Sequence, residues 1–356
     1  MSDPSSDRPP RRPRYQGTHP RQFHEKYKEQ QPERYPEDVA KVLDSGKTPA
    51  GMHRPILVQE ILEVLAPRPG DIAVDCTLGY GGHARELLAA IQPGGKLLGI
   101  DADPVELPKT EARLRGFGFP PEALVCRRMN YAGVADFVSA ETPDGVGADL
   151  LLADLGLSSM QIDDPARGFS FKTDGPLDMR MNPAKGLSAA QLLSSLTPER
   201  FAEILKINAD EPMAGPLASA ILQTHRRTPL TTTETLAEVV YTAAARMSRA
   251  TADDPESTVR RVFQALRIAV NDEFTTLDTF LKRLPDCLKP GGRVAILSFH
   301  SGEDRRVKQA FKDGLKLGIY SSIAPDVIRP EPAEQRANPR SSPAKLRYAV
   351  RSAAPV

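Results

Sequence analysis

The stretch Asp75–Leu88, DCTLGYGGHARELL, holds the residues best suited to binding a small molecule. Gly79, Gly81 and Ala84 fit the G-x-G-x-x-G/A spacing of a dinucleotide-binding turn. Asp75 and the same two glycines also fit an acidic-x-x-x-Gly-x-Gly turn that binds S-adenosylmethionine. Glycines at the end of a strand let the backbone approach a ligand closely and let a helix begin there. Both ligands contain an adenosine, so this stretch alone leaves the choice between them open.

Acidic residues around this turn favour S-adenosylmethionine. Asp101 ends the next strand, where a carboxylate usually binds the ribose hydroxyls of either ligand. Asp75 precedes the glycines, where its charge would repel a pyrophosphate but suit the ammonium group of a methionine. Asp154 follows three leucines at the end of a further strand, and we expect it beside the ligand cleft. His83 adjoins the turn, where its ring could bind the ligand, cap the helix or simply pack.

The hydrophobic pattern places these residues on a parallel α/β sheet. Short apolar strands alternate with amphipathic helices from Asp71 to Gly156, which is typical of a sheet covered on both faces. Only helical segments follow until the strand 290–300, and one amphipathic stretch, 258–284, predicts a long helix. Thr197 with Pro198 marks the start of another helix. The alternating stretch KLRYAVR, 345–351, predicts a late strand.

These segments predict a Rossmann-like α/β fold interrupted by an all-helical insertion. We expect the α/β domain over residues 51–160 and 260–351 and the insertion over residues 161–259. Residues 1–50 are rich in Pro, Arg, Gln and Glu with almost no apolar period, so we expect a disordered extension there.

The overall composition narrows the class of protein. The chain has 356 residues, 40% of which are hydrophobic. Its net charge is only +1, so the overall charge does not indicate a nucleic-acid partner. Basic residues do gather near both ends, which predicts either solvated surface or phosphate contacts. The three cysteines lie far apart and form neither a metal pair nor a disulfide framework. We therefore expect reduced thiols and no metal. Since the sequence has neither a signal sequence nor an apolar run of membrane-spanning length, we expect a cytoplasmic protein.

Several motifs resemble the RsmH/MraW family of bacterial methyltransferases, which methylate cytosine N4 in small-subunit ribosomal RNA. The resemblance covers residues 52–351, and the segment 154–181, DLGLSSMQIDDPARGFSFKTDGPLDMRM, is its most specific part. The other matching segments are HRPILVQEILEVL, DCTLGYGGHARELL, VFQALRIAVNDE, GGRVAILSFHSGEDRRVK and NPRSSPAKLR. Residues 1–50 have no counterpart in the family pattern, and Gly302 and Pro343 depart from it.

The resemblance implies a class I S-adenosylmethionine-dependent methyltransferase acting on one cytosine in the decoding region of 16S ribosomal RNA. Its implied partner is the small ribosomal subunit, with no membrane partner; the oligomeric state is left open, a homodimer being one option. The implied cofactor-binding residues are Gly81, Gly82, His83, Asp101, Tyr131, Asp154 and Gln161. An ordinary half-buried aromatic is the alternative for Tyr131.

The sequence suggests two residues for the chemistry. Asp154 is the first candidate to accept a hydrogen bond from the attacking amine, although its charge could serve only the cofactor. His300, at the end of the strand 290–300, could touch the substrate, or could form a structural hydrogen bond to a neighbouring loop. Phe169, Phe171 and the basic residues near them suit a splayed base, with packing under the insertion as the alternative.

Two other classes of function stay open at this point. One is a methyltransferase acting on DNA or protein, although DLGL at Asp154 differs from the polar-Pro-Pro-aromatic motif of DNA amino-methyltransferases. The other is a nicotinamide-dependent oxidoreductase, for which the sequence offers no clear acid–base pair.

Overall fold

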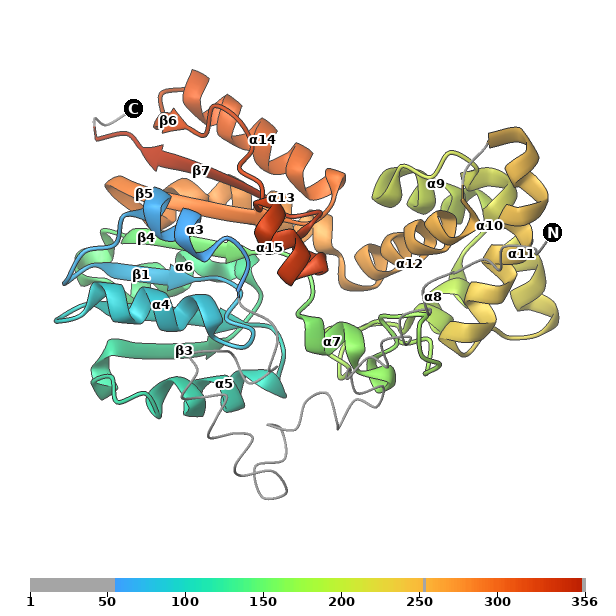
Figure 1. Cartoon of the computed structure of the whole chain (residues 1–356), viewed down its shortest axis with the longest axis horizontal. Coiled ribbons are helices and arrows are strands. Elements are labelled where there is room, and N and C mark those ends of the chain that lie inside the picture. The colour runs from blue at the N-terminus through green and yellow to red at the C-terminus, as the bar shows by residue number, and fades with distance from the viewer. Residues whose placement is uncertain (1–54, 252–253, 354–356) are drawn as a thin grey trace, which may run out of the picture. The chain divides into compact units, whose positions relative to one another are not determined.

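The structure, a computed structural model that describes residues 55–251 and 254–353, contains a seven-stranded sheet with helices packed on it (Figure 1). The strand order is β3-β2-β1-β4-β5-β7-β6, parallel from β3 to β5, with β7 antiparallel to both of its neighbours. The chain order reverses between β1 and β4, so their carboxyl ends flank the crevice where such sheets bind ligands. The strands are β1 Ile72–Asp75, β2 Lys96–Asp101, β3 Leu124–Arg128, β4 Ala148–Asp154, β5 Leu288–Ser298, β6 Tyr320–Ile323 and β7 Lys345–Arg351.

Helices cover both faces of this sheet, as the alternating pattern predicts (Figure 1). On one face, α3 Val58–Leu65, α4 Gly82–Ile91 and α5 Glu106–Arg115 share an apolar cluster with β1 and β2. On the other face, α6 Val134–Glu141, α13 Glu273–Arg283 and α14 Ser301–Lys316 bury Phe137, Phe280 and Phe311 against the strands. Because both faces are covered, the central strands are apolar throughout rather than alternating.

A separate core joins the helices between β4 and β5. The buried residues of this core come from the segment 169–179 and from five helices: α8 Ala189–Ser195, α9 Pro198–Ala209, α10 Ala214–Arg227, α11 Thr233–Thr251 and α12 Pro255–Asn271. As predicted, the Thr197 hydroxyl caps α9 by accepting a hydrogen bond from the Arg200 N–H. No strand lies between β4 and β5 among the described residues. The predicted domain boundary at residue 260 falls inside α12; the division itself and the proposed extension 1–50 stay predictions, the latter outside the described residues.

Two details of the chain differ from the sequence-based expectation. The stretch 258–284 is not one helix, because Asp272 adopts a left-handed conformation (φ 50°) that ends α12 and lets α13 begin in a new direction. The strand β6 carries no apolar alternation, since Ser321 and Ser322 are exposed, so only its pairing with β7 reveals it. Short helices α7 Ser159–Asp163 and α15 Pro332–Ala337 complete the fold.

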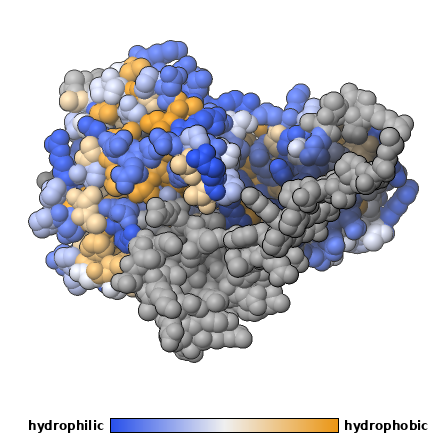
Figure 2. All heavy atoms as spheres, viewed as in Figure 1, coloured by the Kyte–Doolittle hydropathy of each residue, from blue (hydrophilic) through white to orange (hydrophobic). Residues whose placement is uncertain are grey.

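The visible face of the molecule carries both hydrophilic and hydrophobic residues. Figure 2 shows hydrophilic residues over much of the visible face, with hydrophobic residues gathered mainly over the sheet region. Within the ranges that the structure describes, no helix is long and apolar enough to cross a membrane.

Candidate active site

The glycine turn lies between β1 and α4, at the carboxyl edge of the sheet. Gly79 and Gly81 both have positive φ angles, 47° and 76°, which favour glycine. The Gly81 N–H donates to the Leu78 carbonyl (2.7 Å), and Gly81 then caps α4. A Cβ on Gly81 would lie 3.0–3.2 Å from side-chain carbons of α5, so the glycine is needed for close packing behind the turn. This packing requirement adds to the close ligand approach that the sequence predicts for the turn.

Three carboxylates meet at this edge, at the ends of β1, β2 and β4. Asp75 is buried, with 1% of its surface exposed, and burial raises the pKa of its carboxyl from 3.8 to about 6. Burial also raises the pKa of Asp101. Asp154 keeps about a third of its side chain exposed (30%), and its Oδ1 is buried with no hydrogen-bond partner among the described residues. The negative charges of Asp154 and Asp101 each contribute to the raised pKa of Asp75, so this edge favours a cationic ligand.

His83 faces one of these carboxylates. Its Nε2 lies 3.5 Å from Oδ2 of Asp154, close enough for an ion pair but without an aligned hydrogen bond. The ring nitrogen and the Asp154 Oδ1 are therefore buried polar atoms that no described protein group satisfies. Buried polar groups normally find partners, so an unsatisfied donor and acceptor side by side fit a ligand with complementary groups.

Asp101 is engaged with its own loop. Its Oδ2 accepts a hydrogen bond from the Gly79 N–H (2.7 Å) and its Oδ1 accepts one from the Asp103 N–H (2.8 Å). The carboxylate therefore fixes the glycine turn in place, and any ligand hydroxyl must share its remaining lone pairs. The structure brings Asp101, His83 and Asp154 to one edge, as the sequence predicts.

Tyr131 and Gln161 have structural contacts of their own. The Tyr131 ring packs edge-to-face on Phe280 (centroids 5.4 Å apart), and burial raises the pKa of its hydroxyl. The Gln161 Oε1 accepts from the Ser158 N–H, while its Nε2 donates to Asp103 Oδ2 (2.9 Å). A cofactor role for either residue stays a prediction. Asp103 also lies in this site, although the sequence analysis did not predict it. Its only sequence signal is that it is the second acidic residue of DADP (101–104).

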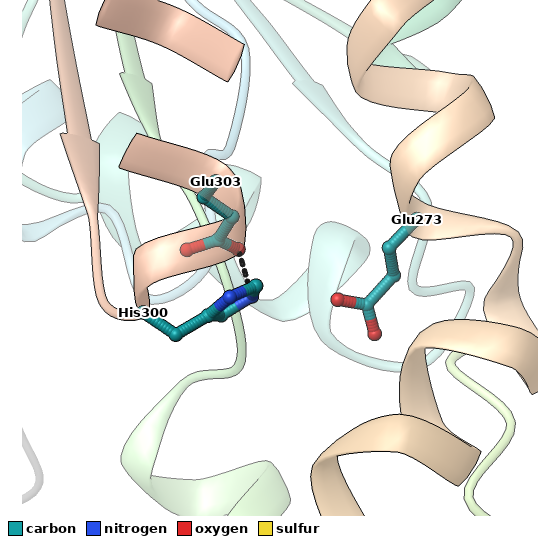
Figure 3. A group of neighbouring side chains, drawn as sticks. All are labelled: Glu273, His300 and Glu303. Atoms are coloured by element: carbon teal, nitrogen blue, oxygen red, sulfur yellow. Dashed lines mark ion pairs between the residues drawn. The ribbon is translucent and has the colours of Figure 1, made fainter. Parts of the chain in front are cut away.

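His300 lies in a buried ion-pair cluster next to β5 (Figure 3). Its Nε2 is 3.2 Å from Glu303 Oε1, both ring nitrogens are buried, and 11% of the side chain is exposed. Burial alone would raise the pKa of Glu303, but His300, Arg267 and the Phe299 N–H together hold it below its usual range. Neither ring nitrogen has an aligned hydrogen-bond partner among the described residues, so a substrate role for His300 stays a prediction beside the structural alternative.

The same cluster includes Glu273, and its donor atoms have the proximity of a metal site. One ligand atom each from Glu273, His300 and Glu303 lies within 4.8 Å of the others. However, Arg267 donates to both oxygens of Glu273 at 2.9 Å. The guanidinium already supplies the positive charge that a metal would bring, so we assign the group as an ion-pair cluster.

The segment 154–181, which we call the signature segment, does not present its aromatic side chains in the way that binding a splayed base would require. Phe169 is buried in the helical core, and Phe171 packs edge-to-face on Phe263 (centroids 5.3 Å apart). Arg180 makes two hydrogen bonds to Asp178, at 2.8 and 2.7 Å. The alternative reading, packing against the helical insertion, is therefore the one that the structure favours for both phenylalanines.

Three of the basic residues near the C-terminus form ion pairs within the fold. Arg347 donates to Asp304 at 2.6 Å, and Lys345 lies 3.7 Å from the same carboxylate. Arg340 pairs with Asp163. Because these cations neutralise internal carboxylates, the expectation that they bind RNA phosphates finds no support in the structure.

A doubly covered, mostly parallel sheet with a glycine turn and acids at its carboxyl edge defines a Rossmann-like fold that binds an adenosine-containing cofactor. The family to which the chain belongs identifies a methyltransferase, whose cofactor is S-adenosylmethionine. The chain belongs to the MraW methylase family, whose model matches residues 50–352. This membership excludes the nicotinamide oxidoreductase alternative.

Curated relatives cover almost the whole chain. "Ribosomal RNA small subunit methyltransferase H 1" of Lachnoclostridium phytofermentans is 47% identical over 344 residues, 96% of this chain and 93% of the relative. "Ribosomal RNA small subunit methyltransferase H 2" of Alkaliphilus metalliredigens is also 47% identical, over 96% of this chain and 97% of the relative.

Solved structures are more distant. A SAM-dependent O-methyltransferase from Thermotoga maritima shares 11% identity at a TM-score of 0.37, covering 84% of this chain and 66% of that one. A SAM-dependent methyltransferase from Aquifex aeolicus shares 9% identity at a TM-score of 0.36, covering 88% of this chain and 96% of that one.

Proposed function

We propose that this protein transfers a methyl group from S-adenosylmethionine to the exocyclic N4 of one cytosine in the decoding region of 16S ribosomal RNA. The names of relatives that share 47% of their residues with this chain support ribosomal RNA as the substrate. The observation that best supports amine chemistry is the unsatisfied Oδ1 of Asp154 at the end of β4, beside the switch point of the sheet.

The cofactor would be held by the glycine turn and the acids around it. Gly81 and Gly82 begin α4, so their backbone and the ring of His83 can bind the methionine part. Asp101 is placed for the ribose hydroxyls, and the negative charge of Asp75 and Asp154 suits the cationic groups of the molecule. When bound, S-adenosylmethionine supplies an electrophilic methyl group on a sulfonium.

The residues of the chain then act on the acceptor amine. The lone pair of cytosine N4 is delocalised into the ring, which makes N4 a weak nucleophile. In our proposal, Oδ1 of Asp154 accepts a hydrogen bond from N4, which localises the lone pair and fixes the line of attack. Oδ1 of Asp154 would then take the proton that N4 loses on accepting the methyl group that the bound cofactor would supply.

The cysteines support N4 as the methylated atom over C5. Methylation of C5 requires attack on the ring by a thiolate. Burial raises the pKa of Cys76 well above its usual range and that of Cys126 and Cys287 to about 12. All three thiols are therefore held in the protonated, unreactive form.

The RNA-recognition role of the insertion, residues 161–259, also belongs to this proposal. Lys172 is exposed in the signature segment, and Arg226 and Arg227 are exposed at the end of α10, where they can reach phosphates. A target base must leave its stack to reach the methyl group, which is easiest in a single-stranded or distorted part of the RNA.

The test is product analysis with isotopically labelled cofactor. Purified protein is incubated separately with small ribosomal subunits, naked small-subunit RNA, DNA and a protein extract, and digested nucleosides are examined by mass spectrometry. We expect one labelled methyl on cytidine, at N4. Label on C5, or label on DNA or protein with none on RNA, would refute the proposal.

A further inference from the structure

We propose that Arg167 is a positioning residue for methyl transfer, fixing the segment Gly168–Met181 relative to the cofactor-binding edge of the sheet. This inference rests on the proposed function, in which the segment Gly168–Met181 lies on the side of the site that binds RNA. Arg167 donates to Asp103 Oδ2 (3.0 Å) and to the Met181 carbonyl (2.8 Å), so one guanidinium joins the two regions. Only 16% of its side chain is exposed.

Asp103 is the fixed point of this contact. Its carboxylate is 2% exposed and accepts four hydrogen bonds, from two backbone N–H groups at the start of α5, from Gln161 and from Arg167. Although burial opposes ionisation, these bonds together lower the pKa of Asp103, so a charged carboxylate faces the guanidinium. An ion pair in this setting is well oriented because its acceptor cannot rotate away.

A continuous series of hydrogen bonds connects this pair to the glycine turn. Gly79 donates to Asp101, which also accepts from the Asp103 N–H, and Asp103 accepts from Arg167. The Arg167 guanidinium then holds the Met181 carbonyl. The cofactor turn and the far end of the signature segment are therefore fixed to each other through side chains rather than through the chain between them.

The segment that Arg167 anchors is closed on itself. A Cβ on Gly168 would lie 2.1 Å from the Pro176 carbonyl oxygen, and a Cβ on Gly175 would lie 1.9 Å from the Pro165 carbonyl oxygen. Asn271 at the end of α12 holds the Met181 N–H as well (2.7 Å). The segment is also packed into the helical core through Phe169, Leu177 and Met179, and Arg167 is the side chain that ties it to Asp103 beside the glycine turn.

The remaining nitrogen of Arg167 suggests that its role is not stability alone. Its Nε is buried and finds no acceptor among the described residues. An unsatisfied buried donor costs free energy, so a residue kept only for stability would be expected to satisfy it. The orientation that lets the guanidinium reach both Asp103 and Met181 leaves its Nε without an acceptor.

The test separates positioning from binding and from folding. Arg167→Lys keeps a cation for Asp103 but loses the forked contact with Met181. We expect cofactor affinity, measured by calorimetry, to stay within about threefold, while kcat at saturating RNA falls by about 10- to 100-fold, as a small misplacement of reacting groups would cause. Unchanged kcat in the folded Arg167→Lys variant would overturn the proposal.

Chemical rescue provides the second measurement. Arg167→Ala leaves a cavity of guanidinium shape beside Asp103, so millimolar guanidinium should restore at least a tenth of the lost kcat. The matched control is Lys289→Met, which breaks a 2.8 Å ion pair with Asp149 at the opposite edge of the sheet and should keep wild-type kcat. Absence of rescue in a folded Arg167→Ala protein would mean that the ion pair serves stability alone. If that variant does not fold, Arg167→Lys decides.

These results are distinguishable from failure of the proposed function. If wild-type protein places no methyl group on cytosine N4, the proposed function fails before any variant is measured. If the wild type forms the expected product and Arg167→Lys turns over at the same rate, only the positioning role is wrong.

Discussion

Replacing Asp75 by asparagine should make the cofactor-free protein more stable. The carboxylate of Asp75 is buried at the end of β1, and both Asp101 and Asp154 add negative charge near it. Asparagine has nearly the same shape and can still accept the hydrogen bond that the Thr77 N–H donates to Oδ1 (3.0 Å). The substitution therefore removes the buried charge and keeps the local hydrogen bond.

The size of the effect follows from the pKa of this group. Burial is the main cause that raises the pKa of Asp75 from 3.8 to about 6. Each pKa unit corresponds to about 1.4 kcal/mol, so ionising this carboxyl in the folded protein costs about 3 kcal/mol. Between these two pKa values the unfolded chain has lost the proton and the folded protein still holds it. The contribution of Asp75 to stability therefore falls as pH rises from 3.8 to about 6 and is constant above that.

Urea unfolding of the wild type and Asp75→Asn across pH 4.5 to 8 measures this effect. The variant's advantage in unfolding free energy should grow with pH and level off at about 3 kcal/mol above pH 6. Asp326→Asn, which replaces an exposed aspartate, is the control and should show no such profile. A variant less stable than the wild type at pH 7, or a difference that does not change with pH, would refute this reasoning.

Three further predictions concern the site and the extension. Gly81→Val should abolish cofactor binding by calorimetry and lower the unfolding free energy by at least about 1–2 kcal/mol, because a left-handed conformation and close contacts with α5 exclude a branched side chain; normal affinity would remove the turn from the site. Asp154→Asn should fold normally but lose methyl transfer, whereas His300→Ala should keep cofactor affinity and lose about 1–3 kcal/mol of stability, since the buried Glu303 carboxylate loses one of its partners. Turnover assays and urea unfolding measure both variants, and a stable but inactive His300→Ala beside an active Asp154→Asn would exchange their roles. Deleting residues 1–50 should leave the melting temperature nearly unchanged, and a large drop would show that this segment docks on the rest of the chain.

Local spacing was sufficient to predict which residues meet at the carboxyl edge of the sheet. The glycines of the turn, Asp101 and Asp154 each follow a short apolar strand, and parallel strands bring their carboxyl ends to one edge. The Thr197 cap and the strand 345–351 were predicted for the same reason, since a cap and a two-residue alternation depend on neighbours in sequence.

The partners of charged and aromatic side chains were decided by tertiary structure. The sequence shows Arg347 as one of several basic residues, but only the pairing of β7 with β5 brings it to Asp304. Arg167 and Asp103 are 64 residues apart, and no local pattern indicates that they meet. Periodicity shows which side of a helix or strand is apolar, but the choice of partner for a long polar side chain depends on where distant elements pack. The sequence therefore determined the glycine turn and the acids beside it, and the tertiary structure determined which charged side chains are already paired within the protein.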